Sequence, residues 1–479
     1  MADVITVGLD FGTHQTKICV QRKPDEGMGR PIYEFLTFKD LKGEKHYAIP
    51  SVIQRNDDDT LSYGFVDEEL IKKTDGDTIL YELPKPMEYN VSAFDLYEQY
   101  STTEDMDESL DVLNTMITAR KAQLQNRYEH KLRQAKEHNA EVYGLKYRHL
   151  YRYFKQATFS ERTWDKDIDP DILSIWYLAY LIFKLEDLYG QDFAIQMGIP
   201  TDDNDLRLKK WKAVRILMSA YRLVEEVFEN DLSAFLSTRI TDLLGKTVYV
   251  EYSEEKKDEY FIKVFPEAYA GLMPLTTRGK LTDGMSLTID IGGGTTDISF
   301  FTINNNEPLI YKYWSIPKGL NYLTENSGIK DTRKLEEKDI DENLLLLFKQ
   351  DIINHVGMLT TKLYRLFSAS SLYKAKLTNA LTDRVVIYAG GGSTFDFLLS
   401  SVGTFTDVKD IDPEYWREER IVNPEKVLKL CPILNTAYGL SIEAETDDIQ
   451  LKPLDSIFDS ESFREHTNKT FNYIDKDMV

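Results

Sequence analysis

One short pattern constrains this chain more than any other: an apolar run that ends at an aspartate and continues into a glycine turn. It occurs at residues 7–18 (VGLDFGTHQTKI) and again at residues 287–298 (LTIDIGGGTTDI). Each copy predicts a strand, a tight turn and a returning strand, because glycine and hydroxyl residues between two apolar runs are typical of a hairpin. A third glycine turn, at residues 385–395 (VVIYAGGGSTF), follows another apolar run. Two such hairpins that face each other can hold a polyphosphate and its metal ion between them.

The composition fits a large globular protein and excludes several classes. The 479 residues suffice for two or more domains. The net charge of -22 argues against non-specific binding to nucleic acid or to an anionic membrane. The two cysteines cannot build a disulfide framework, and no apolar run approaches the roughly 20 residues that span a bilayer. We expect no secretory leader before the first strand. We therefore expect a cytoplasmic protein with no membrane insertion and no nucleic-acid partner.

The order of predicted elements repeats coarsely in the two halves of the chain. The simplest architecture for such a repeat is a duplicated α/β fold with a cleft between its halves. We expect a first lobe over residues 1–201, with its remainder and the crossover over 202–285. The second lobe is expected over 286–443 and includes a helical subdomain at 305–383. Residues 444–479 are polar and acidic, and we expect them to pack poorly.

Several segments carry clear local patterns. Pro170 to Leu188 predicts an amphipathic helix, with Asp169 as its N-cap and the proline at the first helical position. Residues 193–200 predict a buried strand. Residues 264–272 predict a turn that enters a short helix.

A basic, proline-free segment interrupts the first half at residues 104–156. Its apolar residues recur at helical spacing, which predicts a helical arm. From Arg120 to Lys155, basic residues outnumber acidic ones, the reverse of the whole chain. Two interpretations stay open: a long solvated arm packed on its neighbour, or a docking surface for an acidic partner.

The turns carry the residue types that nucleotide phosphates require. Glycine turns expose backbone N–H groups and let the backbone approach a ligand closely. Asp10 and Asp290 would repel a phosphate, so we predict that a hard cation such as Mg²⁺ lies between them and the phosphates. Lys17, on the returning strand, is placed to reach a terminal phosphate. Hydroxyl donors in the turns are Thr13, Thr295, Thr296 and Ser393.

The three turns, in this order, resemble those of the ATPase superfamily of actins, heat-shock chaperones and sugar kinases. The resemblance covers roughly residues 3–443. Its first phosphate motif is residues 10–17, its second is residues 290–297 and its adenosine motif is residues 390–393. The resemblance implies a duplicated ribonuclease-H-like fold, with two lobes around a nucleotide cleft, and ATP or ADP with Mg²⁺ as ligands. Nucleotide-binding residues implied within the turns are Gly12, Thr13, His14, Gln15, Gly292, Gly293, Gly294, Thr295, Thr296, Gly391, Gly392 and Ser393.

Within that superfamily, the nucleotide-binding part of the DnaK-type heat-shock chaperones is most similar. The segment at residues 49–51 (IPS) resembles a Pro-Ser segment of the family. Glu267 follows a proline, as in the turn where the family's glutamate orders water around the metal. Arg365 matches an arginine that packs on the adenine. The family's catalytic lysine lies on a separate segment, for which Lys85 is the candidate, whereas Lys17 matches the actin-type position.

The chain also departs from the chaperone pattern. His14 and Gln15 replace a threonine and an aromatic residue, and Phe395 stands where a second adenine-packing arginine is expected. Thr361 and Tyr364 stand where the family has a ribose-binding glutamate and lysine. These departures lie around the phosphates and the adenosine.

We therefore expect a magnesium-dependent, slow ATPase that acts as a heat-shock-chaperone-like switch. Asp10 and Asp290 would hold hydrated Mg²⁺, Glu267 would orient the attacking water and Lys17 would steady the phosphates. We expect no substrate domain within residues 444–479, and we expect hydrolysis to drive a hinge motion that gains or releases a separate protein partner or client. Two alternatives stay open. Residues 432–439 resemble plasmid-segregating bacterial actins, which favours a filament former. A small-molecule kinase would need a carboxylate base in a substrate pocket, for which the sequence offers no convincing candidate beyond Glu267.

Overall fold

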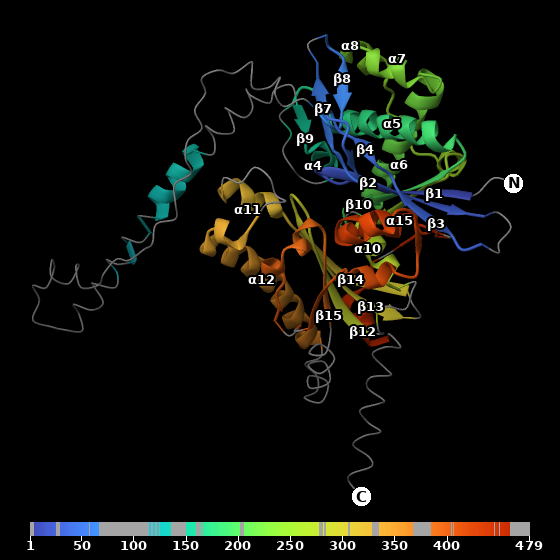
Figure 1. Ribbon diagram of the computed structural model, residues 1–479. Coiled ribbons are helices and arrows are strands. Elements are labelled where there is room, and N and C mark those ends of the chain that lie inside the picture. Colours follow the sequence, from blue (N-terminus) through green and yellow to red (C-terminus); the bar gives the residue numbers. More distant parts are fainter. Residues whose placement is uncertain are drawn as a thin grey trace, which may run out of the picture. The chain divides into compact units, whose positions relative to one another are not determined.

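The computed structural model shows a mixed α/β protein with several sheets (Figure 1). The structure describes residues 4–24, 29–56, 58–66, 150–159, 164, 166–201, 206–276, 281, 284–304, 307–327, 335–366, 385–403, 405, 407–444, 446–449 and 451–459, with part of 115–135. The chain divides into two compact units, residues 1–66 with 151–479 and residues 67–150. Both large sheets belong to the first unit. Lys85 and most of the expected arm lie outside the described residues. No helix in the described ranges is long and apolar enough to cross a membrane.

The larger sheet is built on the N-terminal hairpin. It has seven strands in the order β11-β10-β1-β2-β3-β17, with β6 paired to β2. Neighbours among β1, β2 and β3 are antiparallel, whereas β10 runs parallel to β1 and β11 parallel to β10. Its strands are β1 (Val4–Asp10), β2 (Gln15–Lys23), β3 (Ile32–Phe35), β6 (Ile49–Pro50), β10 (Ala194–Ile199), β11 (Ile262–Pro266) and β17 (Arg420–Ile421). Most of β1 is buried, as expected for a strand covered on both faces.

The second large sheet repeats this arrangement. Its five strands follow the order β14-β13-β12-β15-β16, in which β12, β13 and β14 are antiparallel neighbours and β15 runs parallel to β12 and β16 to β15. Order and direction match those of β3, β2, β1, β10 and β11. Its strands are β12 (Gly284–Ile291), β13 (Thr296–Asn304), β14 (Glu307–Ile316), β15 (Val385–Ala389) and β16 (Asp407–Asp410). Smaller sheets comprise β4 (Phe38–Lys39), β5 (Lys45–His46), β7 (Val52–Arg55), β8 (Leu61–Tyr63) and β9 (Leu150–Arg152).

The helices cover the sheets and join them. The helices that matter here are α4 (Phe154–Phe159), α5 (Pro170–Tyr189), α6 (Leu206–Arg222), α7 (Leu232–Ser237), α8 (Ile240–Lys246), α9 (Glu254–Glu259), α10 (Glu267–Thr276), α11 (Leu320–Ser327), α12 (Glu342–Leu366), α14 (Pro424–Val427) and α15 (Cys431–Ser441). Helix α15 packs on β1, β2 and β10 of the larger sheet and on β15 of the second. Its close approach explains Gly8, since a Cβ there would lie 2.3 Å from the carbonyl oxygen of Ala437. One helix therefore contacts both sheets.

The local predictions hold where the sequence pattern is strong. The helix α5 begins as predicted, with the Asp169 carboxylate accepting the N–H of Asp171, and β10 occupies the predicted buried strand. The end of the predicted arm is wrong: residues 150–152 form a strand and α4 follows it. Tyr151 and Phe154 are each 1% exposed, so their aromatic rings belong to the core of the first unit and not to a solvated arm.

The predicted poor packing of residues 444–479 is wrong for the part that the structure describes, which ends at residue 459. We call residues 444–459 the C-terminal strap. Lys452 donates its backbone N–H to Ile310 of β14 at 2.8 Å. Leu454 and Ile457 are buried in the core under the second sheet.

The strap also contacts the larger sheet, through Asp447. The Asp447 carboxylate accepts the backbone N–H of Val264 in β11 at 3.1 Å. It forms ion pairs with Lys257 at 3.2 Å and Lys210 at 3.8 Å, and its side chain is 13% exposed. The strap therefore contacts an edge strand of each large sheet, β11 and β14, which covers backbone groups that an edge would otherwise leave open.

A carboxyl group on α5 gives the fold a pH-dependent contribution. Both carboxylate oxygens of Glu186 are buried and have no hydrogen-bond partner within the described part of the chain. Burial, followed by repulsion from Glu225, raises the pKa of Glu186 to about 7. Because the folded pKa lies above the ordinary value of 4.5, this group destabilises the fold progressively as the pH rises from about 4.5 to about 7.

The change Glu186→Gln should therefore stabilise the protein mainly at high pH. We expect the free energy of unfolding to rise by about 1 kcal/mol at pH 8, a value discounted for the partial exposure of the side chain. At pH 5 the folded side chain is neutral and the unfolded one is only just above its ordinary pKa of 4.5, so the gain should be much smaller. Urea unfolding at the two pH values measures this, with the exposed neighbour Asp187→Asn as control. Equal gains at pH 5 and pH 8 would contradict the assignment.

Candidate functional site

The two predicted aspartates occupy equivalent positions in the two large sheets. Asp10 ends β1 and is 6% exposed, and Asp290 is the penultimate residue of β12. Across each hairpin, Asp10 pairs in register with Lys17, and Asp290 pairs with Asp297. The Lys17 ammonium lies 3.0 Å from the Asp10 carboxylate. The hairpin turns, predicted from local sequence, therefore place one carboxylate at the same point of each sheet.

The carboxylates of the two hairpins lie close enough to interact. Burial and then repulsion from Asp297 raise the pKa of Asp290 to about 7. The attraction of the Lys17 ammonium opposes this rise. Repulsion from Asp10 and Glu267 adds to it. Burial alone would lower the pKa of Lys17, but the Asp10 carboxylate outweighs it and the pKa is raised. The structure thus brings together the four predicted catalytic residues.

Lys155 of α4 also belongs to this cluster, and the sequence analysis missed it. Its ammonium lies 2.5 Å from Oε1 of Glu267, the first residue of α10, and its side chain is 4% exposed. Burial raises the pKa of Glu267 and Lys155 opposes that rise. Lys155 had been counted with the basic arm. The dense aromatic run around it, Tyr151 to Phe159, is the feature that could have marked the segment as core.

The first turn (residues 11–14) contacts the second turn (residues 292–295) through His14. A Cβ on Gly293 would lie 2.8 Å from Nδ1 of His14, and one on Gly294 would lie 3.0 Å from Cε1. The Nε2 atom of His14 is hydrogen-bonded to the side-chain amide of Asn321, just beyond the second turn in space. Side chains at Gly293 and Gly294 would therefore collide with the histidine ring that lies against them.

The third turn (residues 390–394) packs directly on the second aspartate. Gly390 has φ +77°, a conformation that L side chains rarely adopt, and a Cβ there would lie 2.2 Å from Oδ1 of Asp290. Its N–H donates to the carbonyl of Pro432 at 3.0 Å. Ser393 donates its hydroxyl to the Gly390 carbonyl at 2.9 Å. The predicted adenosine motif thus adjoins the predicted metal site.

The other residues predicted to bind phosphate have different hydrogen-bond partners in the structure. Gly12 accepts the hydroxyl of Ser51 at 2.6 Å through its carbonyl. The Thr295 hydroxyl donates to Asp297 at 3.3 Å. Thr296 is fully buried, and its hydroxyl donates to the Lys318 carbonyl at 2.8 Å. Thr296 therefore supports the second turn from inside, whereas its contact with a phosphate stays a prediction.

The residues expected around the adenosine are less enclosed. Arg365 is exposed in the last turn of α12, and Thr361 is exposed one turn earlier. Phe395 and Tyr364 both pack against the core of the second sheet, and the Phe395 ring lies 5.6 Å from that of Phe397. Gln15 begins β2 as an exposed residue. Their contacts with a nucleotide stay predictions.

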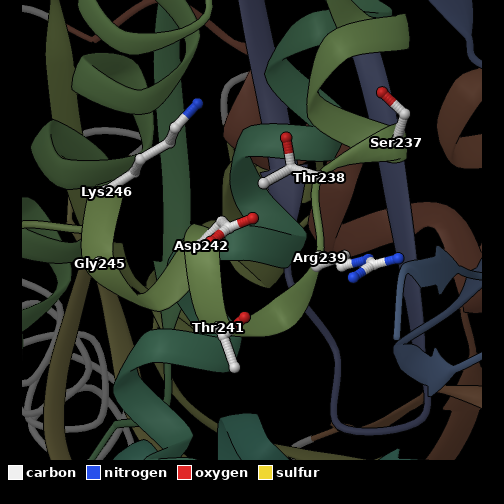
Figure 2. A pocket seen from close by; sticks show the side chains of 7 residues that line it. All are labelled: Ser237, Thr238, Arg239, Thr241, Asp242, Gly245 and Lys246. Atoms are coloured by element: carbon white, nitrogen blue, oxygen red, sulfur yellow. The ribbon is translucent and has the colours of Figure 1, made fainter. Parts of the chain in front are cut away.

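Two other features lie apart from this cluster. A polar hollow lies at the corner of α7 and α8, and Figure 2 shows side chains that line it, including those of Arg239 and Lys246. None of its lining residues belongs to the cluster.

The second feature apart from the cluster is the group Asp40, Glu44 and His46 in the hairpin of β4 and β5. Asp40 already accepts two backbone N–H groups and pairs with the His46 ring, so this group stabilises its own turn.

In comparisons with known proteins, no family model matches this chain and no curated protein matches its sequence. The functional assignment therefore depends on the site itself.

The site holds more negative than positive groups. Four carboxylates interact there with two ammonium groups: Asp10, Asp290, Asp297 and Glu267 with Lys17 and Lys155. Such an excess of negative charge among buried and partly buried groups is unfavourable by itself, and a hard cation with oxygen ligands would neutralise it.

Proposed function

We propose that this chain is an Mg-ATP-binding, slowly ATP-hydrolysing nucleotide switch. One observation carries the proposal: two aspartates, Asp10 buried and Asp290 partly buried, occupy the same position in two matching hairpins and interact across the site, beside three glycine turns. Backbone N–H groups in glycine turns bind phosphate oxygens, and paired carboxylates bind the accompanying Mg²⁺. Neither half alone supplies both aspartates.

The strand arrangement supports a duplicated ribonuclease-H-like fold as in the actin-like ATPases. Both large sheets have three antiparallel strands followed by two parallel ones, in the same order. In each sheet the aspartate turn joins the first two strands along the chain, β1 with β2 and β12 with β13. We propose that the sheets form two lobes and that nucleotide hydrolysis changes their opening.

We assign the metal-binding role to Asp10 and Asp290. Their carboxylate oxygens suit Mg²⁺, which keeps several of its waters in proteins, so both would act through water. The bound ion would neutralise charge on the phosphates. Lys17, paired with Asp10, would keep that carboxylate in place and steady the phosphates.

We assign the handling of water to Glu267, supported by Lys155. In hydrolysis, the water oxygen bonds to the terminal phosphorus as the bond to the bridging oxygen breaks, which releases ADP and phosphate. The water proton would be held at Oε1 of Glu267 before it passes to phosphate. The adjacent Lys155 ammonium would stabilise negative charge on the terminal phosphate, the role for which Lys85 was the candidate.

The nucleoside would lie at the third turn. Gly391, Gly392 and Ser393 would surround it, and Arg365 would pack on the adenine. The output of the switch would be a protein partner or client that is gained or released as the lobes open.

The change Asp290→Ala tests the proposal. Loss of one carboxylate should weaken Mg-ATP binding about tenfold, as for other groups that hold a metal through water. Isothermal titration with Mg-ATP measures this, and Asp242→Asn in the hollow of Figure 2 is the control. In the presence of EDTA the two proteins should differ less. Unchanged affinity and turnover in Asp290→Ala would refute the site.

A further inference from the structure

We propose that His14 is a positioning residue that latches the first turn to the second and thereby sets how long a nucleotide stays bound. This rests on the proposed function, because the two turns are the proposed phosphate sites. The latch is the pair formed by His14 of the first hairpin and Asn321 of α11. It joins the first hairpin of the larger sheet to α11, the helix that follows β14 of the second sheet.

The Asn321 side of the latch is held firmly to the second turn. The N–H of Asn321 donates to the Gly293 carbonyl at 2.8 Å, and the N–H of Leu320 donates to the Gly292 carbonyl at 2.9 Å. A Cβ on Gly319 would lie 2.5 Å from the Gly292 oxygen, so the two backbones are in contact. A displacement of Asn321 therefore displaces the second turn.

The His14 side is equally fixed. Its carbonyl accepts the N–H of Ser51 at 2.9 Å, and the Ser51 hydroxyl holds the carbonyl of Gly12. The imidazole then lies against Gly293 and Gly294. The second turn is thus enclosed by the histidine ring and by the backbone at residues 319–321. Since both ends are anchored, breaking the pair should let the two turns separate.

The same ring contacts the segment that carries Lys155. Tyr153 meets the His14 ring edge-on, with ring centroids 5.1 Å apart at 75°. Tyr153 has φ +64°, a strained conformation for an aromatic residue and one that surrounding contacts must maintain. It lies two residues before Lys155. His14 therefore links three parts of the proposed site, and a threonine at this position would be too short to do so.

The test is a double-mutant cycle on nucleotide release. A fluorescent ATP analogue, bound with Mg²⁺, is chased with excess Mg-ATP in wild type, His14→Ala, Asn321→Ala and the double variant. We expect each single change to raise the dissociation rate about tenfold, in line with a strong hydrogen bond. The double variant should release no faster than either single one, because both changes break one contact. His14→Gln, which keeps a hydrogen-bonding amide, should recover part of the effect, and His46→Ala should have none.

Other outcomes overturn the latch. If His14→Ala speeds release and Asn321→Ala does not, His14 acts as a direct phosphate ligand only. Additive effects would mean that the two residues act separately.

Hydrogen exchange separates this proposal from the proposed function. The amides of Leu320 and Asn321 should exchange faster in His14→Ala than in wild type, without nucleotide. If wild type binds no nucleotide but this exchange increases, the proposed function fails and the latch between the turns stands. If exchange at both amides is unchanged, the latch is refuted whatever the nucleotide result.

Discussion

Replacing Lys155 with alanine is expected to reduce ATP turnover about 100-fold or more, while Mg-ATP affinity changes far less. The ammonium is buried, lies 2.5 Å from Glu267 and shares the site with Asp290 and Asp297. A buried cation aimed at a developing negative charge acts mainly in the transition state, because the charge on the transferred phosphate changes there. Phosphate release at saturating Mg-ATP measures turnover, and isothermal titration measures affinity.

A set of related variants makes this result interpretable. Loss of Lys155 leaves Glu267 buried without its partner, so Lys155→Ala with Glu267→Gln tests whether the protein stays folded when both charges are removed. Lys246→Ala, in the hollow of Figure 2, is the surface control. Turnover of Lys155→Ala within threefold of wild type would contradict the assignment. If Lys17→Ala alone abolishes turnover, the actin-type position serves the terminal phosphate.

The change Asp447→Ala is expected to lower the free energy of unfolding by about 3 kcal/mol, the typical cost of breaking a buried ion pair. Lys210 and Lys257 would lose their shared carboxylate, and the Val264 N–H would lose its acceptor. Burial already lowers the pKa of Lys210, and Asp447 offsets that effect, so an unpaired Lys210 would be costly to keep charged. Urea unfolding at neutral pH measures the loss.

The adjacent residue supplies the matched control for the strap. Asp448 is exposed and acts on Lys210 less strongly than Asp447 does, so Asp448→Ala should change stability by no more than about 0.5 kcal/mol. Asp447→Asn keeps an acceptor for the Val264 N–H and should lose less than the alanine variant. Equal losses in Asp447→Ala and Asp448→Ala would show that the strap responds to overall charge and not to this contact.

The two aspartate hairpins could be predicted because turn formation is local. An apolar run, a glycine turn and a second apolar run specify β1 with β2, and β12 with β13, within about a dozen residues. The helix α5 was predictable for the same reason, since Asp169 and Pro170 mark its start. The third turn was also visible in the sequence. Its contact with Asp290 was not, because β15 must first pair with β12.

The residues that sequence analysis missed interact with partners that lie far away along the chain. Lys155 and Glu267 are 112 residues apart, and the aromatic run beside Lys155 was attributed to the arm. The strap was expected to be solvated because its composition is acidic, but composition does not reveal that Lys257 lies 190 residues away in sequence and beside Asp447 in space. The same holds for His14 and Asn321, which are 307 residues apart.

The sequence by itself determined the local elements of this protein: two aspartate turns, a third glycine turn and the α5 helix, each specified by neighbours along the chain. Only the tertiary structure decided which charges meet. It placed Lys155 beside Glu267, Asp10 near Asp290 and the acidic strap beside Lys210 and Lys257. The physical reason is that turn and helix preferences act over a few residues, whereas ion pairing and burial depend on distances in space that only the packed sheets establish.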